Sequence, residues 1–227
     1  MIIDATFVTS AVTASGLPRD GLAEMALVGR SNVGKSSLIN ALVHQRVART
    51  SAAPGKTRLA NVYRVARGGV EPFYLVDLPG YGYARGGRGA AQEFEALSAA
   101  YFGRDRREGR KRQETNPARP ADPAGVSALL LIDARHPGLE SDLAAWRWLT
   151  ATVGRCALVA TKIDKLSRAE RLRALKANEA AFEQPVLPVS ASTGEGLDEL
   201  WKLIERLTSR NRNNRRHPRQ PRRLPKS

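Results

Sequence analysis

One stretch of this chain constrains its fold more than any other. It reads Gly29-Arg30-Ser31-Asn32-Val33-Gly34-Lys35-Ser36, and Ser37 follows. The stretch fits the spacing G-x-x-x-x-G-K-[ST], which is typical of a loop that binds phosphate. An apolar run over 25–28 precedes it, and apolar side chains recur at helical spacing over 37–43. A strand, a phosphate loop and a helix are therefore predicted in this order.

The residue types in this loop suit a nucleotide. Gly29 and Gly34 let the backbone turn so that successive N–H groups converge on phosphate oxygens, beside the positive end of the helix. Lys35 is expected to reach the β- and γ-phosphates, and the Ser36 hydroxyl is expected to hold Mg²⁺. The alternative is a glycine-rich turn before an ordinary helix, and the strand, loop and helix context argues against it.

The totals suit a single α/β domain with charged appendages. The chain has 227 residues and a mass of 24.7 kDa. Its one cysteine excludes an internal disulfide framework. No run approaches the about 18 apolar residues of a membrane helix, and the first residues lack the pattern of a signal peptide. We therefore expect a cytoplasmic, monomeric protein with no membrane partner.

Most of the net charge of +15 lies in two segments. Residues 208–227 contain eight Lys or Arg and no acid, and residues 104–123 contain seven basic and four acidic residues. The tail over 208–227 is too polar to bury a core, so we expect it to be disordered when free. Two interpretations of each segment stay open at this point, namely contact with RNA and a solvated, solubilising stretch.

Alternating strand and helix patterns predict an α/β fold. We expect a mostly parallel, six-stranded sheet with one antiparallel strand and helices on both faces. Besides the strand before the phosphate loop, the pattern predicts strands over 6–12 (at an edge), 61–66, 73–77, 126–133, 156–160 and 185–189. Helices are expected over 89–102, 142–152, 167–182 and 197–207, in addition to the one after the phosphate loop.

Four further polar segments lie in loops or directly after apolar strands, where α/β folds keep ligand contacts. They are Gly55-Lys56-Thr57, Asp77-Leu78-Pro79-Gly80, Thr161-Lys162-Ile163-Asp164 and Ser190-Ala191-Ser192. Together with the phosphate loop they resemble, in order and spacing, the motif set of the translation-factor-related GTPases. More narrowly, the runs over 52–57, 77–83 and 131–135 resemble the EngB (YihA/YsxC) family of bacterial ribosome-assembly GTP-binding proteins. The resemblance covers about residues 5 to 207, and it implies a P-loop GTPase domain over 1–207 with a basic insertion at 104–123.

The resemblance implies a role for each of these segments. Asp164 would accept two hydrogen bonds from guanine, a pattern that adenine does not offer. Lys162 would lie along the base, Thr161 stands where other GTPases have Asn, and backbone N–H groups around Ser190 and Ala191 would meet guanine O6. Asp77 would act on Mg²⁺ through water, and Thr57 would bind it when the γ-phosphate is present. Residues 48–60 and 77–90 would order with GTP and relax with GDP.

One element of the Ras-like machinery is absent. The position after Gly80 holds Tyr81, where Ras-like proteins place a Gln that orients water, so slow intrinsic hydrolysis is expected. The catalytic set is then Lys35, Thr57, Gly80 and Asn32. Asn32 resembles the Asn of GTPases that bind K⁺ between the α- and γ-phosphates. Alternatively, it is a loop Asn that bonds the backbone.

The function that this resemblance implies is GTP-dependent ribosome assembly. The chain would bind GTP and GDP with Mg²⁺, hydrolyse GTP slowly, and bind large-subunit ribosomal RNA or its precursor in the GTP form, with a role in growth and cell division. Two alternatives stay open. One is an RNA-binding module that is controlled by the bound nucleotide and in which hydrolysis is incidental. The other is a GTPase of the tRNA-modification type.

Overall fold

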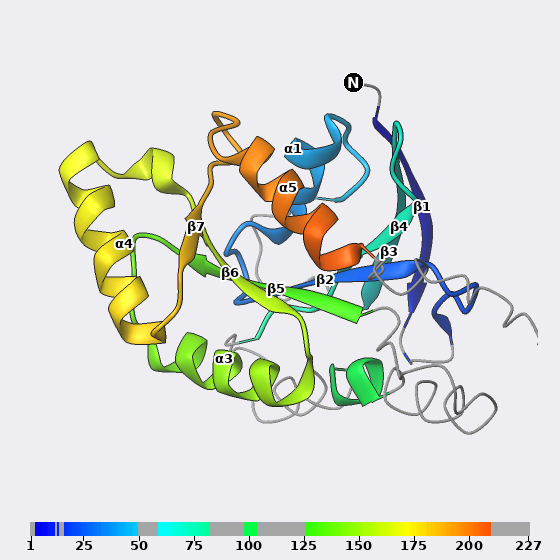
Figure 1. Cartoon of the computed structure of the whole chain (residues 1–227), viewed down its shortest axis with the longest axis horizontal. Coiled ribbons are helices and arrows are strands. Elements are labelled where there is room, and N and C mark those ends of the chain that lie inside the picture. The colour runs from blue at the N-terminus through cyan, green and yellow to red at the C-terminus, as the bar shows by residue number, and fades with distance from the viewer. Residues whose placement is uncertain are drawn as a thin grey trace, which may run out of the picture.

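The computed structural model describes residues 3–11, 13, 16–49, 59–81, 98–103 and 126–209. These residues build one seven-stranded sheet with the order β1-β3-β4-β2-β5-β6-β7 (Figure 1). The strands are β1 Ile3–Ala11, β2 Ala23–Gly29, β3 Ala60–Arg67, β4 Phe73–Asp77, β5 Val126–Asp133, β6 Cys156–Thr161 and β7 Val186–Pro188.

The sheet is parallel apart from one strand. β3 pairs antiparallel with both β1 and β4. The other pairs, which are β4 with β2, β2 with β5, β5 with β6 and β6 with β7, are all parallel. The expected single antiparallel strand is therefore confirmed, as is the hairpin of β3 and β4. The expected number of six strands in the sheet is wrong by one. The edge strand predicted over 6–12 is confirmed as β1, and it pairs with β3 along its length within the same sheet.

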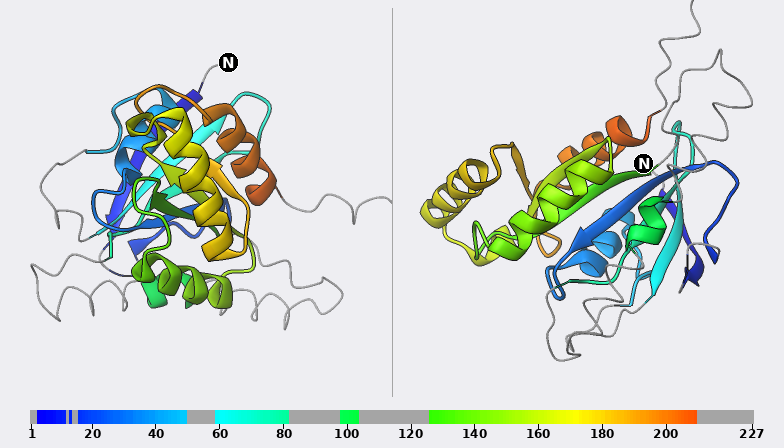
Figure 2. Two further views of the ribbon diagram at one scale, coloured as in Figure 1. Left: turned by 90° about the vertical axis from the view of Figure 1, so that its left-hand side faces the viewer. Right: turned by 90° about the horizontal axis from the view of Figure 1, so that it is seen from below.

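Helices cover both faces of the sheet, as expected. They are α1 Lys35–Val43, α3 Glu140–Thr152, α4 Arg168–Phe182 and α5 Leu197–Thr208, with a further helical stretch at 98–103. α1 and α5 pack on one face, whereas α3 and the stretch at 98–103 pack on the other (Figures 1 and 2). None of the described helices is both long and apolar enough to span a bilayer.

β5 shows why the centre of this sheet reads as an unbroken apolar run. All of its residues are buried, and successive side chains enter opposite cores. Leu129 and Leu131 join the core that includes α1 and α5, whereas Leu130 and Ile132 join the core beneath α3. Because β2, β4, β5 and β6 run in the same direction, the loops that follow them meet at one edge of the sheet.

Several sequence-based expectations lie outside the described residues. They are the loop at 50–58 with Gly55, Lys56 and Thr57, residues 82–90 of the segment expected to order with GTP, the first part of the helix over 89–102, the insertion at 104–123 and the tail from 210 onward. The expected start of the tail at 208 is wrong by two residues, because Thr208 is the last residue of α5 and Ser209 N–H donates to the Glu205 carbonyl. In contrast, the expected capping of α4 is confirmed. The Ser167 side chain accepts from the backbone of Glu170, and the Glu170 carboxylate accepts from the backbone of Ser167 at 2.8 Å.

A glycine at the start of α5 provides a test of this architecture. Gly196 has a φ of 78°, and a Cβ added there would meet the carbonyl oxygen of Pro188 at the end of β7. We therefore expect Gly196→Ala to lower the free energy of unfolding by about 2–4 kcal/mol in urea titrations. Gly154→Ala is the matched control, since nothing lies within 4 Å of a Cβ there. Equal stability of the two variants would contradict the described turn.

Candidate nucleotide site

The phosphate loop joins the end of β2 to the start of α1. Gly34 has a φ of 112°, which places it in the left-handed region just before Lys35 begins the helix. Gly29 is equally constrained, because a Cβ there would lie 2.8 Å from the carbonyl oxygen of Leu131. The Lys35 side chain is buried and donates to the carbonyl oxygens of Gly29 at 3.2 Å and of Arg30 at 3.4 Å. The ammonium group thus lies within the curve of the loop.

A buried carboxylate faces this loop from the end of β4. Asp77 is 2% exposed, and its Oδ2 accepts from the Ser36 hydroxyl at 2.8 Å. Burial raises the pKa of Asp77 against the opposing effects of Lys35 and the Ser36 hydrogen bond, and burial lowers the pKa of Lys35 against the effect of Asp77. Asp77 Oδ1 is buried and has no hydrogen-bond partner among the described residues. Such an oxygen is unfavourable unless a cation or water meets it.

These groups fit Mg²⁺. A hydroxyl and a carboxylate are hard oxygen donors, and Mg²⁺ keeps several water ligands beside one or two protein groups and substrate phosphates. The described residues hold no cluster of three or more His, Cys, Asp or Glu that would suit an all-protein metal cage. A metal at Ser36 and Asp77 would thus depend on phosphate and water for its remaining ligands.

The segment after Asp77 packs directly on the phosphate loop. Leu78 N–H donates to the Leu27 carbonyl at 3.3 Å, and Ser31 N–H donates to the Tyr81 carbonyl at 3.1 Å. Between them, Gly80 lies so close that an added Cβ would be 2.6 Å from the nitrogen of Ser31. Only glycine permits this approach. The structure therefore brings together two segments that are far apart in the sequence, 29–36 and 77–80.

The loop after β6 is tied to the phosphate loop by two side chains. The Thr161 hydroxyl donates to the Val33 carbonyl at 2.7 Å, and the Lys162 ammonium donates to the Asn32 carbonyl at 2.6 Å. Asn32 and Lys162 both have a φ of 61°, so each adopts the left-handed conformation that is uncommon outside glycine. Ile163, which follows, is buried and holds the loop to the core.

Asp164 is held for ligand binding by the loop after β7. Its Oδ1 accepts from the Ser190 hydroxyl at 2.7 Å, and Lys165 lies 3.2 Å from Oδ2. Partial burial raises the pKa of Asp164, but the hydrogen bonds from Ser190 and Lys165 outweigh it, so the net shift is downward. The carboxylate is thereby kept ionised and oriented.

The loop over 190–196 is shaped by the Ser190 side chain. Its oxygen accepts from the backbone of Ser192 at 3.2 Å and of Thr193 at 3.1 Å. Ser190 N–H itself donates to the Glu195 carbonyl at 2.9 Å. This leaves Ala191 as the better source of an N–H group for a base carbonyl, with Ser190 acting through its hydroxyl.

One acidic residue in the site was assigned no role from the sequence. Asp133, at the end of β5, accepts from Arg135 through Oδ1 at 2.9 Å and Oδ2 at 2.7 Å, and from the Lys162 ammonium at 3.0 Å. Burial raises its pKa, but these hydrogen bonds outweigh burial and lower it strongly. The position of Asp133 directly after an apolar strand could have marked it as a site residue. Its ion pair with Lys162 depends on the pairing of β5 with β6, which the sequence alone does not reveal.

Comparison with known proteins gives this site a context. Residues 24–162 match a family model described as 50S ribosome-binding GTPase. A probable GTP-binding protein EngB from Solibacter usitatus is 42% identical over 203 residues, covering 89% of this chain and 95% of that protein. The corresponding protein of Chlorobaculum tepidum is 37% identical over 210 residues, covering 91% of this chain and 98% of that protein.

Solved structures share the fold. A crystal structure of a probable GTP-binding protein EngB has a TM-score of 0.54 and 20% identity, and covers 82% of this chain and 98% of its own. Era bound to MgGDPNP and nucleotides of 16S ribosomal RNA has a TM-score of 0.63 and 22% identity, covering 82% of this chain and 56% of its own. At these identities the likeness establishes the GTPase fold.

Asp133 offers a test of how the Thr161–Asp164 loop supports the phosphate loop through Lys162. We expect Asp133→Asn to weaken GDP binding by about 1–2 kcal/mol, because Lys162 loses its carboxylate partner beside the phosphate loop. Isothermal titration calorimetry measures the effect. Glu140→Gln is the control, since the Glu140 and Arg147 side chains are both exposed and their pair should contribute little. An unchanged GDP affinity in Asp133→Asn would show that Lys162 does not need this partner.

Proposed function

This chain belongs to the EngB family of GTP-binding proteins and carries its GTPase domain, and we propose that it is a GTP-dependent assembly factor of the large ribosomal subunit. In this proposal the GTP form binds ribosomal RNA or its precursor, and hydrolysis releases it. The observation that carries the proposal is the direct joining of Asp77, the phosphate loop and the Thr161–Asp164 loop. A nucleotide held there would contact all three at once.

Guanine selectivity would rest on Asp164. Its carboxylate accepts hydrogen bonds and donates none, so it suits the N1–H and amino group of guanine and not the acceptor nitrogen of adenine. Ser190 and Lys165 hold the group, which reduces the entropy lost when the base binds. Lys162 would cover the base with its aliphatic stem while its ammonium stays on the Asn32 carbonyl.

Mg²⁺ would be held by Ser36 directly and by Asp77 through water, with Thr57 as a further ligand in the GTP form. When bound, the ion would neutralise negative charge on the β- and γ-phosphates. Lys35 would add a positive charge from the protein, and the Gly80 N–H would meet the γ-phosphate. K⁺ at Asn32 remains part of this proposal, and equal hydrolysis rates in KCl and NaCl would count against it.

The setting of Tyr81 supports slow intrinsic hydrolysis. Its hydroxyl donates to Asp142 Oδ1 of α3 at 2.9 Å. Burial, followed by the charge of Asp142, raises the pKa of Tyr81 far above its ordinary value, so the phenol stays protonated. A side chain tied to α3 in this way would not orient water at the γ-phosphate. Acceleration would then come from a bound partner.

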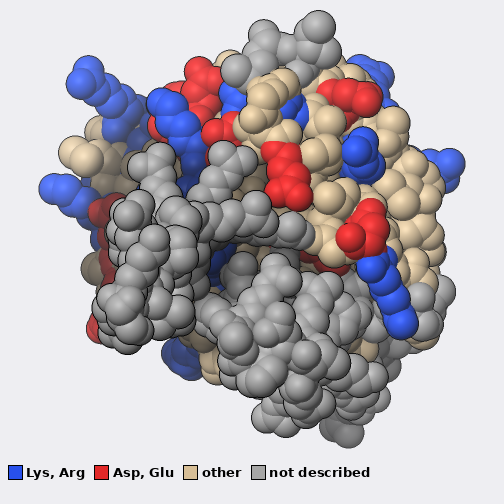
Figure 3. Space-filling model, turned by 45° about the vertical axis from the view of Figure 1, so that its right-hand side comes forward, with Lys and Arg blue, Asp and Glu red and all other residues tan. Residues whose placement is uncertain are grey.

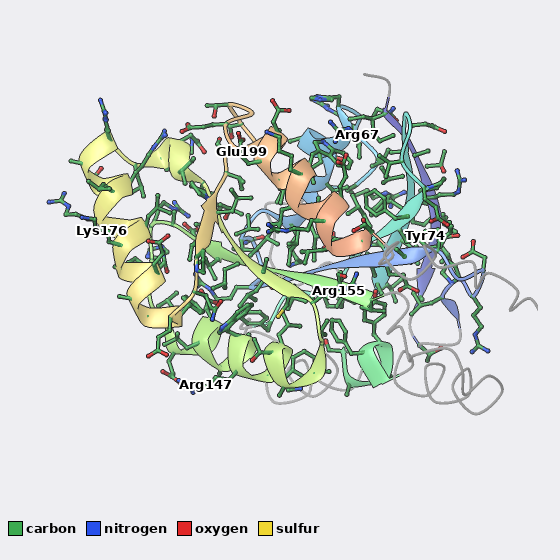
Figure 4. All side chains as sticks on the ribbon, in the orientation of Figure 1. Arg67, Tyr74, Arg147, Arg155, Lys176 and Glu199 are labelled. Carbon is green, nitrogen blue, oxygen red and sulfur yellow. The ribbon has the colours of Figure 1, made fainter. Side chains whose placement is uncertain are left out.

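The RNA part of the proposal draws on where the charged segments join the fold. The Ser127 hydroxyl, near the start of β5 after the insertion, donates to the Leu207 carbonyl at 2.8 Å. Arg155, which Figure 4 labels, donates to the carbonyls of Leu207 and Ser209. The described residues nearest to the end of the insertion and to the start of the tail, Ser127 and Ser209, are thus held close together at the end of β5 that lies away from the phosphate loop. On the face shown in Figure 3, basic and acidic side chains of the described residues are interspersed. The two segments carry most of the net charge of +15, so they would supply most of the attraction to RNA.

Steady-state hydrolysis with purified large ribosomal subunits tests this proposal. We expect the chain to hydrolyse GTP and not ATP, and large subunits to raise the rate at least about tenfold, since partner groups stabilise the charge of the transition state. The increase should shrink in a variant that ends at Ser209, which keeps the contact with Arg155 and removes the basic residues from 210 onward.

The controls separate the parts of the proposal. A chain with the eight basic tail residues replaced by Gln keeps the length and should behave as the shortened variant does. Raising KCl should weaken the effect of subunits steeply. A turnover rate that ignores subunits in every variant would contradict the ribosome partner while leaving the GTPase assignment in place.

The base specificity has its own test. Asp164→Asn should weaken GTP binding by about 2–4 kcal/mol, because it replaces a charged acceptor with a neutral group that presents only one acceptor oxygen. Xanthosine triphosphate, which has a carbonyl in place of the guanine amino group, should lose less affinity. Asp198→Asn in the first turn of α5 is the matched control. If Asp164→Asn keeps its preference for GTP, Asp164 does not read the base.

A further inference from the structure

The side chains of Asp142, Arg30 and Tyr81 form a cluster beside the site, in which Asp142 is buried and the other two are half-buried. Asp142 lies in the first turn of α3 and is 1% exposed. Its Oδ1 accepts from the Tyr81 hydroxyl at 2.9 Å and lies 3.1 Å from Arg30 Nε. Arg30 belongs to the phosphate loop, whereas Tyr81 follows Gly80. One carboxylate thus joins α3 to both segments.

Burying the Asp142 carboxylate costs free energy that an apolar side chain at this position would not cost. Burial raises the pKa of Asp142, while Arg30 and Tyr81 oppose the shift. Asp142 Oδ2 is buried and has no hydrogen-bond partner among the described residues. Leaving such an oxygen unpartnered is unfavourable, and an apolar residue of similar size would avoid the penalty. The carboxylate is therefore better explained by what it holds in place.

What it holds is the backbone next to Gly80. The Tyr81 carbonyl accepts from Ser31 N–H at 3.1 Å, and Arg30 and Tyr81 form a parallel bridge that continues the line of β2 and β4. The Ser31 hydroxyl also donates to the Gly80 carbonyl at 3.4 Å. The side chains of Arg30 and Tyr81 meet at Asp142, so both ends of this backbone contact are fixed from α3.

We propose that Asp142 is a positioning residue for the γ-phosphate: through Tyr81 and Arg30 it holds Gly80 against the phosphate loop, where its N–H meets a nucleoside triphosphate. The proposal rests on the proposed function, because it takes Gly80 as the γ-phosphate contact. A segment that is held in place loses less conformational freedom on binding, which favours the triphosphate. A diphosphate lacks the γ-phosphate, so its affinity does not depend on this hold.

The experiment compares the affinities of GDP and a non-hydrolysable GTP analogue, both with Mg²⁺, by calorimetry. The variants are Tyr81→Phe, which keeps the ring, and Asp142→Asn, which keeps the shape of the side chain. Each should weaken binding of the analogue about tenfold, the scale of a lost hydrogen bond to a charged group, and leave GDP within about twofold. The double variant should add little to either single one, since both remove the same contact.

Tyr74→Phe is the matched control. The Tyr74 hydroxyl also donates to a carboxylate, Asp20 Oδ2 at 2.7 Å, and Tyr74 lies on β4 away from the nucleotide site (Figure 4). It removes the same chemical group without touching the cluster, so both nucleotide affinities should stay unchanged. Urea unfolding of all variants shows whether each is folded at the temperature of the titration.

The outcomes are distinct. Equal weakening of GDP and the analogue would assign the cluster a purely structural role, and unchanged or stronger binding of the analogue would show that it does not prepare the γ-phosphate site. Either result overturns the inference. If the unaltered protein binds neither guanine nucleotide, it is the proposed function that fails. If the unaltered protein binds both and the variants do not discriminate between them, only the role of Asp142 falls.

Discussion

The buried carboxylate of Asp77 is the constraint on which the site depends. Its position at the end of β4, opposite the phosphate loop, follows from the parallel pairing of β4 with β2. One oxygen is held by the Ser36 hydroxyl, and the other has no hydrogen-bond partner within the described part of the chain. Removing a charge from water is costly unless an opposite charge compensates. The site thus has an electrostatic requirement that a bound cation satisfies.

The remaining contacts make the site one unit. Thr161 and Lys162 bond the carbonyls of Val33 and Asn32, so the loop that would read the base also shapes the loop that would hold the phosphates. Gly80 packs on Ser31 from the other side. Because interiors are close-packed, such contacts allow few alternative arrangements. Such rigidity would allow the proposed base, metal and γ-phosphate contacts to depend on one another.

The sequence predicts local features of this protein better than the contacts between them. The strand, loop and helix around residues 29–36, the apolar strands, the hairpin of β3 and β4 and the capping of α4 follow from spacing and residue type, and the structure confirms them. The strand near the N-terminus is also predicted, but its place as the seventh strand of the same sheet depends on long-range pairing between β1 and β3. The roles of Asp133 and Asp142 likewise depend on partners far away in the chain. A single acidic residue in a polar loop does not indicate such partners in the sequence, because most acidic side chains in that position face water.

The position of the bound metal shows whether a cation meets the Asp77 carboxylate. Crystals of the protein with a non-hydrolysable GTP analogue and Mn²⁺ in place of Mg²⁺ would place the ion by its anomalous scattering. We expect one ion at about 2.1–2.2 Å from Ser36 Oγ, close to the distance for Mg²⁺, with a water between the ion and Asp77 and phosphate oxygens as further ligands. An ion bound elsewhere, or a nucleotide held in this loop with Ser36 still bonded to Asp77 and no metal between them, would contradict this expectation.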